Sequence, residues 1–317
     1  MSDDDKLNAM NNLWRNFCVS DAFEPGSTAK PFTLATGLET GTLTGQETYV
    51  CQGGTWKGDW YIQCHNTSGH GTENVDQAIA NSCNVALMAM ADKIGVEDFI
   101  RYQHIFGFGE YTGIDLPGEA STENLIFTAE NMGETDLGNV FLGQSFNVTM
   151  TQMVSAFSSL INGGYYYQPH VVKQIQDENG NVIETNDPTL LRKTVSKQTS
   201  DRVKEALRAV MTDGTGVPAN VEGYDIGGKT GTAEKLPRGN GDYLLSFIGY
   251  APQENPEVVI YVVIDEPNVE NQELSSYVLE LSQKIMAESI SISEHYKKRG
   301  CTARGQRCKR RRTAGFR

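Results

Sequence analysis

The chain has 317 residues, of which 38% are hydrophobic and 9% aromatic, enough for one large domain or two small ones with a sizeable core. Residues 1–295 contain 17 Lys/Arg and 40 Asp/Glu, a net charge of −23, and such an acidic surface argues against a nucleic-acid partner. The sequence has no run of about 18 apolar residues that could span a membrane, and residues 1–10 lack the apolar stretch of a secretory signal.

Residues 296–317 have a different composition, with ten Lys/Arg and no acidic residue. A basic tail of this kind is typical of an arm that binds nucleic acid or an anionic membrane. The change is abrupt, however, and the segment has no periodic apolar positions, as expected of an artefactual chain end. We adopt the second interpretation: 1–295 form the domain, and 296–317 are a basic tail without an assigned function.

The first half of the chain is predicted to be mainly helical. An apolar run predicts a helix over 33–39 that stops at Gly41, and the Gly-, Thr- and Trp-rich residues 42–64 have the composition of hairpins. Apolar spacing predicts helices over 74–94 and 96–106, followed by a loop over 106–120. Two further helices are expected over 149–161 and 200–211, the second of them capped by Ser200.

The period of the apolar residues changes near the end of the body. Residues 224–236, 243–252 and 257–267 read as three strands joined by turns. The third is so apolar that we expect it at the centre of its sheet and covered on both faces. A final helix is predicted over 274–287. Helices followed by adjacent strands predict an α+β domain with an antiparallel sheet flanked by helices.

Three short stretches carry residues that can perform acyl transfer. In EPGSTAK, Ser27 and Lys30 stand three apart and share a face if a helix begins there. A lysine whose pKa is lowered by burial or a neighbouring cation can act as the base that activates a serine hydroxyl. The plainer alternative is that Ser27 caps the helix and Lys30 is a surface charge.

The other two stretches have equally plain alternatives. Ser82 and Asn84 in NSCN can present a hydroxyl and an amide to a cleft, or form a helix cap. Lys229 and Thr230 lie on a glycine-rich segment that can hold an extended peptide by strand pairing, with Lys229 facing a carboxylate. The alternative is a hairpin with an exposed lysine.

Taken together, Ser-x-x-Lys, Ser-x-Asn and Lys-Thr-Gly in this order are the signature of penicillin-recognising serine enzymes. The wider sequence, over residues 8–288, resembles the class B penicillin-binding proteins, which are monofunctional D,D-transpeptidases of cell division, elongation and sporulation. Matching contexts are EPGSTAK, HGTENVDQAIANSCNVALM, FGFGEYTGIDLPGE, LGQSFNVTMTQMVSAFSSLINGG, GGKTGTAEK and FIGYAPQENPEVVIYVVIDEP. The resemblance implies a transpeptidase fold related to that of serine β-lactamases.

The resemblance also implies a role for each motif. Ser27 would attack the D-Ala-D-Ala carbonyl with Lys30 as base, Ser82 would relay a proton to the leaving group, and Asn84 would hold Lys30 and the substrate amide. The terminal carboxylate would be bound by Lys229, Thr230, Gly231 and Thr232. The backbone N–H groups of Ser27 and Thr232 would form the oxyanion hole.

The resemblance implies peptidoglycan stem peptides as substrates and β-lactams as inhibitors, on the extracytoplasmic face of the bacterial membrane, with no cofactor needed for catalysis. The full-length protein would carry a membrane anchor and work with a polymerising glycosyltransferase. Family members have two strands before the Ser-x-x-Lys helix, and Ser27 lies too near the N-terminus for them. We therefore expect a partial domain, lacking its N-terminal strands and with an unpaired apolar sheet edge, that can be inactive.

Two other functions compete with the transpeptidase. A serine β-lactamase of class A would need a Glu-x-x-Leu-Asn segment, and none occurs between Asn84 and Lys229. A β-lactam sensor or a non-catalytic fragment would keep the same motifs.

A second group of residues predicts a metal site. Cys51, Cys64, His70 and Cys83, spaced by 13, 6 and 13, are a complete tetrahedral zinc set, and some elongation-type relatives carry a metal at similar places. The alternatives are a Cys51–Cys64 disulfide and buried free thiols. His65 is the nearest competitor of His70.

Overall fold

The computed structural model describes residues 2–132 and 143–303, and a three-stranded antiparallel sheet lies at its centre. The strands are β11 (Gly227–Glu234), β12 (Tyr243–Ala251) and β13 (Val258–Asp265), in the order β11-β12-β13. All three predicted strands are confirmed, but the prediction that the third is central was wrong. The apolar run of β13 is explained by helices that pack on it, while β12 takes the central position.

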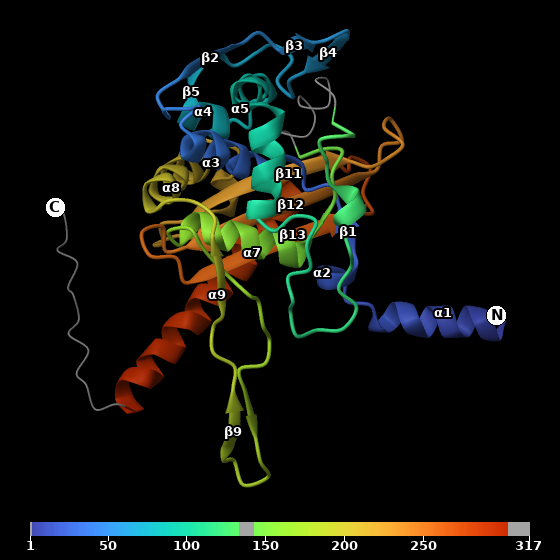
Figure 1. The fold of residues 1–317 in the computed structure, drawn as a ribbon, viewed down its shortest axis with the longest axis vertical. Helices are drawn as coiled ribbons and strands as arrows, with labels where there is room; N and C mark the ends of the chain where they lie inside the picture. The colour runs from blue at the N-terminus through green and yellow to red at the C-terminus, as the bar shows by residue number, and fades with distance from the viewer. Residues whose placement is uncertain (1, 133–142, 304–317) are drawn as a thin grey trace.

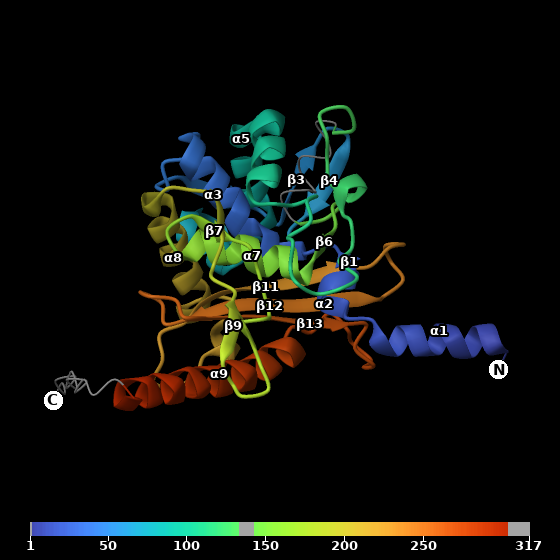
Figure 2. The ribbon, with the colours of Figure 1, turned by 60° about the horizontal axis from the view of Figure 1, so that its bottom comes forward.

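Helices cover both faces of the sheet, as Figure 2 shows. On one face lies α9 (Ser276–Ala303), which packs on β12 and β13. The other face carries α7 (Met150–Ile161) and α8 (Lys197–Thr212), with α3 (Lys30–Thr40) packed against both. This arrangement confirms the predicted α+β fold with an antiparallel sheet flanked by helices.

The last helix is longer than predicted. It continues to Ala303 instead of ending near residue 287, so the basic segment begins as a continuation of α9, and residues 304–317 lie outside the described part of the chain. Among the helices of the described residues, none combines the length and the apolar character that crossing a membrane requires.

The N-terminal elements lead directly to the first motif. They are α1 (Asp3–Trp14), α2 (Phe17–Ser20) and β1 (Ala22–Phe23), which pairs with β6 (Val148–Thr149). A 3-10 turn, η1 (Gly26–Ala29), then runs into α3, and Gly41 ends α3 at φ 74° as predicted. Figure 1 shows α1 projecting from the body.

The predicted helix over 74–94 is interrupted at the second motif. The chain forms α4 (Val75–Ala80) and then α5 (Asn84–Ile105), which has a kink at Gly95. Between the two helices, Ser82 has φ 53°, in the left-handed region. A non-glycine residue rarely adopts this conformation, and a right-handed helix cannot continue through it. The break therefore belongs to the second motif itself.

The remaining strands form peripheral two-stranded sheets. In the region predicted as hairpins, β2 (Thr48–Cys51) pairs with β5 (Gly71–Asn74) and β3 (Gly54–Lys57) pairs with β4 (Trp60–Gln63). Farther along, β7 (Tyr165–Tyr167) pairs with β10 (Leu190–Lys193), and β8 (Gln174–Gln176) with β9 (Val182–Thr185), which forms the lower arm in Figure 1. Two short 3-10 turns, η2 (Glu123–Leu125) and η3 (Val217–Ala219), complete the described elements.

One predicted cap was misplaced. Helix α8 begins at Lys197, and its cap is Ser196, whose hydroxyl accepts the Thr199 N–H. Ser200 lies inside the helix and is buried, with its hydroxyl donating to the Leu160 carbonyl oxygen at 2.6 Å.

Candidate active site

Ser27 lies in η1, the short turn that precedes α3. Neither η1 nor α3 has a side-chain cap, so the expectation that Ser27 caps a helix was wrong. Its hydroxyl makes no hydrogen bond with the described residues. The neighbouring Thr28 hydroxyl, by contrast, donates to the Pro25 carbonyl oxygen at 2.7 Å. Among the described residues, the half-buried Ser27 side chain is therefore not held by a hydrogen bond.

Lys30 opens α3 and is fully buried. Its ammonium group donates to the Ser82 carbonyl oxygen (2.6 Å), the Ser82 hydroxyl (3.0 Å) and Asn84 Oδ1 (2.8 Å). Burial lowers the pKa of Lys30 to about 8, although the thiols of Cys64 and Cys83 act in the opposite direction. Lys30 is therefore no surface charge, and it can lose a proton near neutral pH. Among the described residues its hydrogen bonds reach the second motif and not Ser27, and such contacts often tighten only when substrate binds.

The Ser82 hydroxyl joins the three motifs. It accepts a hydrogen bond from Lys30 Nζ and another, also at 3.0 Å, from Lys229 Nζ. Lys229 is fully buried on β11, and burial, together with the charge of Lys30, holds its pKa well below the usual range of a lysine. With both acceptor positions used, the Ser82 proton is free to be donated to another group. The alternative that Lys229 is an exposed hairpin residue was wrong.

The strand that carries the third motif passes directly against the nucleophile turn. A Cβ added to Gly26 would lie 3.0 Å from the Thr232 carbonyl oxygen, and one added to Gly231 would lie 2.3 Å from Ser246 Oγ. Gly26 also has φ 56°, in the left-handed region, so its backbone and the nearby carbonyl both favour glycine there, whereas the atom nearest to Gly231 belongs to a serine side chain. Thr230 is buried, whereas Thr232 is exposed on the same strand. The structure thus brings the predicted residues of all three motifs together.

Thr215 was missed by the sequence analysis. Its hydroxyl lies 2.7 Å from that of Thr230, and Lys229 Nζ donates to the Thr230 carbonyl oxygen at 3.0 Å. Thr215 belongs to the loop after α8, in the stretch DGTGVP, where a threonine between glycines has no distinguishing signal. It adds a hydroxyl next to the third motif.

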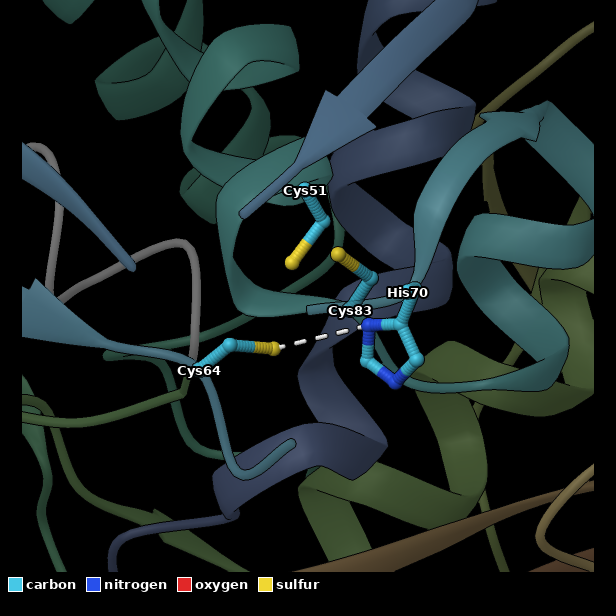
Figure 3. Close-up of side chains that lie close together, drawn as sticks. All are labelled: Cys51, Cys64, His70 and Cys83. Atoms are coloured by element: carbon cyan, nitrogen blue, oxygen red, sulfur yellow. Dashed lines mark hydrogen bonds between the residues drawn. The ribbon is translucent and has the colours of Figure 1, made fainter. Parts of the chain in front are cut away.

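The four predicted metal ligands also come together, as Figure 3 shows. The ligand atoms of Cys51, Cys64, His70 and Cys83 all lie within 4.8 Å of one another, and Cys64 Sγ is 3.7 Å from His70 Nδ1. Ligands that share one zinc at about 2.3 Å are separated by about 3.8 Å. Cys18, Cys51, Cys64 and Cys83 are free thiols, so the alternative Cys51–Cys64 disulfide is not formed in this structure.

The charges around this cluster favour a cation. The contact with Cys83 holds the pKa of the Cys64 thiol well below its usual range, and the same contact together with burial raises the pKa of Cys83. Glu73 is buried, its Oε2 has no hydrogen-bond partner, and that oxygen lies 3.8 Å from His70 Nδ1. Sulfur and nitrogen donors gathered around one point beside a buried carboxyl group fit a bound metal ion. His65 Nδ1 is 3.8 Å from Cys64 Sγ but is not part of the set that closes around one point.

The chain is similar to known proteins along most of its length. Residues 1–290 match the family described as the penicillin binding protein transpeptidase domain. Stage V sporulation protein D of Bacillus subtilis is 34% identical over 281 residues, which are 87% of this chain and 43% of that protein. Penicillin-binding protein PbpB of Mycolicibacterium smegmatis is 30% identical over 80% of this chain and 40% of that protein. The chain thus spans less than half the length of these relatives.

Solved structures agree with the sequence matches. Penicillin binding protein 3 of Mycobacterium tuberculosis superimposes with a TM-score of 0.79 at 27% identity, covering 88% of this chain and 65% of that one. The same protein complexed with aztreonam gives a TM-score of 0.78, over 88% of this chain and 64% of that chain. The chain therefore belongs to the penicillin-binding protein transpeptidase family.

Proposed function

We propose that this chain carries the catalytic centre of a peptidoglycan D,D-transpeptidase that works through a serine acyl-enzyme and is acylated by penicillins. The observation that carries the proposal is the Ser82 hydroxyl, held at 3.0 Å by Lys30 of the first motif and by Lys229 of the third. Three motifs far apart in sequence meet at one proton-carrying group. This arrangement supplies the base and the proton relay that a nearby serine nucleophile requires.

In the acylation step, Ser27 Oγ bonds to the carbonyl carbon of the penultimate D-Ala, and the bond to the terminal D-Ala nitrogen breaks. The serine proton passes to the neutral Lys30 amine, and the leaving nitrogen receives a proton through Ser82. The N–H groups of Ser27 and Thr232 stabilise the oxyanion, a contribution typically worth about 3–4 kcal/mol per donor. An amine of a second stem peptide then attacks the ester, which forms the cross-link and returns the serine hydroxyl.

The substrate carboxylate would be held by Lys229, Thr230 and Thr232, with Gly231 allowing close approach. Burial and the charge of Lys30 lower the pKa of Lys229, and a bound carboxylate would favour its charged form. In the described chain β11 pairs only with β12, so its other side can receive an extended peptide beside η1.

We also propose that Cys51, Cys64, His70 and Cys83 hold a structural zinc ion. Its function would be to fix the turn between α4 and α5, because Cys83 stands between Ser82 and Asn84. Catalysis itself would use no cofactor. In the full-length protein, we place this domain on the extracytoplasmic face of the membrane, anchored and paired with a glycosyltransferase.

The rate of acylation should rise with pH around pH 8. Lys30 must be neutral to accept the serine proton, and its pKa is lowered to about 8, so its basic fraction grows as the pH passes that value and then levels off. Stopped-flow measurement of penicillin acylation between pH 6 and 10 would record this profile. A rate that is flat or that falls between pH 7 and 9 would contradict the assignment of Lys30 as base.

The lifetime of the penicillin adduct tests the proposed function. Intact mass recorded over hours after mixing with a penicillin should show an adduct that persists, as expected for a transpeptidase. Rapid return to the free mass, with hydrolysis of the drug, would instead identify a serine β-lactamase. If no adduct forms, the chain is a non-catalytic fragment and the proposal fails.

A further inference from the structure

Glu24 stands three residues before Ser27, and its carboxylate contacts two segments that are distant in sequence. One oxygen, Oε1, accepts the backbone N–H of Ser145 at 2.8 Å. The other, Oε2, forms an ion pair with Arg238 at 2.5 Å. The Glu24 side chain is only 13% exposed, and that of Arg238 32%. This is a partly buried contact, which is worth more than a pair on the open surface.

The Ser145 contact fixes a strained segment against the nucleophile turn. Ser145 has φ 66°, and the Gly26 N–H donates to the Gly143 carbonyl oxygen at 2.9 Å. A Cβ on Gly143 would lie 1.9 Å from the Gly26 carbonyl oxygen, so the two backbones are in direct contact. Residues 24–26 are thereby fastened from one side.

The Arg238 contact fastens the same turn from the other side. Arg238 lies in the loop that joins β11 to β12, four residues beyond the end of β11 at Glu234. The Gly239 N–H donates to Glu234 Oε1 at 2.6 Å, which ties this loop back to its own strand. The ion pair thus connects the turn that carries Ser27 to the strand that carries Thr232.

These connections form a closed ring. The chain connects Ser27 to Glu24, and the ion pair connects Glu24 to Arg238. The loop then connects Arg238 to β11, where the Thr232 carbonyl oxygen contacts Gly26. The two backbone N–H groups proposed as the oxyanion hole stand on opposite sides of this ring. Their separation decides how well they match the developing oxyanion, and a displacement of a few tenths of an ångström weakens such donors.

We infer that the Glu24–Arg238 ion pair is a positioning element that sets the spacing of the oxyanion hole. The inference rests on the proposed acyl-enzyme function. Glu24 and Arg238 act through the backbone and need not touch the substrate. Their loss should therefore slow bond formation with Ser27 and leave the initial binding of penicillin unchanged.

The test is the acylation of variants by a penicillin, measured over a range of concentrations so that the binding constant and the maximal acylation rate are separated. Arg238→Ala and Glu24→Gln should each lower the maximal rate about fivefold, the size expected for one partly buried ion pair. The binding constant should stay within twofold. The double variant should be no slower than either single variant, because both remove the same contact. Arg238→Lys, which retains the charge, should recover most of the rate.

Lys235→Ala is the matched control. Lys235 lies in the same loop and pairs with Asp265 and Glu266, so its loss disturbs the loop without touching residue 24. It should acylate at the normal rate. An unchanged rate in Arg238→Ala, an equal loss in Lys235→Ala, a change confined to the binding constant, or multiplying effects in the double variant would each overturn the inference. If the unaltered protein forms a penicillin adduct but the variants behave in one of these contradicting ways, the inference is wrong and the proposed function still stands. If the unaltered protein forms no adduct, the inference and the proposed function are both wrong.

Discussion

Replacing Lys30 by methionine should slow penicillin acylation by about three orders of magnitude, the middle of the range for loss of a general base. Methionine has a similar length but cannot accept a proton. Lys30 is fully buried and donates three hydrogen bonds to Ser82 and Asn84, so the change also frees two carbonyl-type acceptors and one hydroxyl. Stopped-flow or quenched intact-mass kinetics would measure the rate.

The same substitution should leave the melting temperature within a few degrees of the original. The lost hydrogen bonds are offset by removal of a desolvated ammonium group, since burying a cation costs free energy even when it is hydrogen-bonded. Lys197→Met is the matched control, because the Lys197 side chain is 77% exposed, at the start of α8, and belongs to none of the three motifs. If Lys30→Met acylates within tenfold of the original rate, Lys30 is not the base.

Removal of the proposed zinc ion from the cysteine cluster should lower the melting temperature by more than about 10 °C, because a structural zinc contributes strongly to the folding free energy. Protein purified without chelator should contain one zinc per chain. Treatment with a strong chelator, or the substitution Cys64→Ser, should reduce this content and shift the melting curve. Elemental analysis and calorimetry on the same samples give both values.

Cys18→Ser is the control for the cysteine cluster. Cys18 is exposed and lies outside the cluster, so its replacement should change neither the zinc content nor the melting temperature. Cobalt substitution offers an independent reading, since thiolate ligands give cobalt a characteristic charge-transfer absorption. Absence of zinc in the native preparation, or full zinc content in Cys64→Ser, would contradict the proposed site.

Much of the candidate active site could be predicted because its motifs are local. Ser27 and Lys30 lie within one turn of each other, and the order of the three motifs restricts the family. The left-handed conformation of Ser82 could not be predicted, because the residues around it have good helical spacing and the strain is maintained by tertiary contacts with two buried lysines. The position of Thr215 could not be predicted for a similar reason. Its hydroxyl lies next to Thr230 because α8, which precedes its loop, packs on β11.

The position of β13 in the sheet could not be predicted from its apolar residues. The apolar run of β13 was interpreted as a central strand, but helices on both faces produce the same pattern in a strand whose only partner among the described residues is β12. The unpaired apolar edge expected from the family comparison corresponds to this strand. The cysteine and histidine cluster was predicted from ligand types and from the resemblance to relatives that carry a metal at similar places. The structure gathers all four residues although they come from different elements.

The central claim is that Ser27 is the residue acylated in a transpeptidase centre, and locating the adduct tests it most directly. The protein would be treated with a penicillin, digested, and the modified peptide sequenced by tandem mass spectrometry, alongside Ser27→Ala. We predict a single modification on Ser27 and none on the variant. An adduct on Ser82 or on any other residue, or an adduct that persists in Ser27→Ala, would contradict the account.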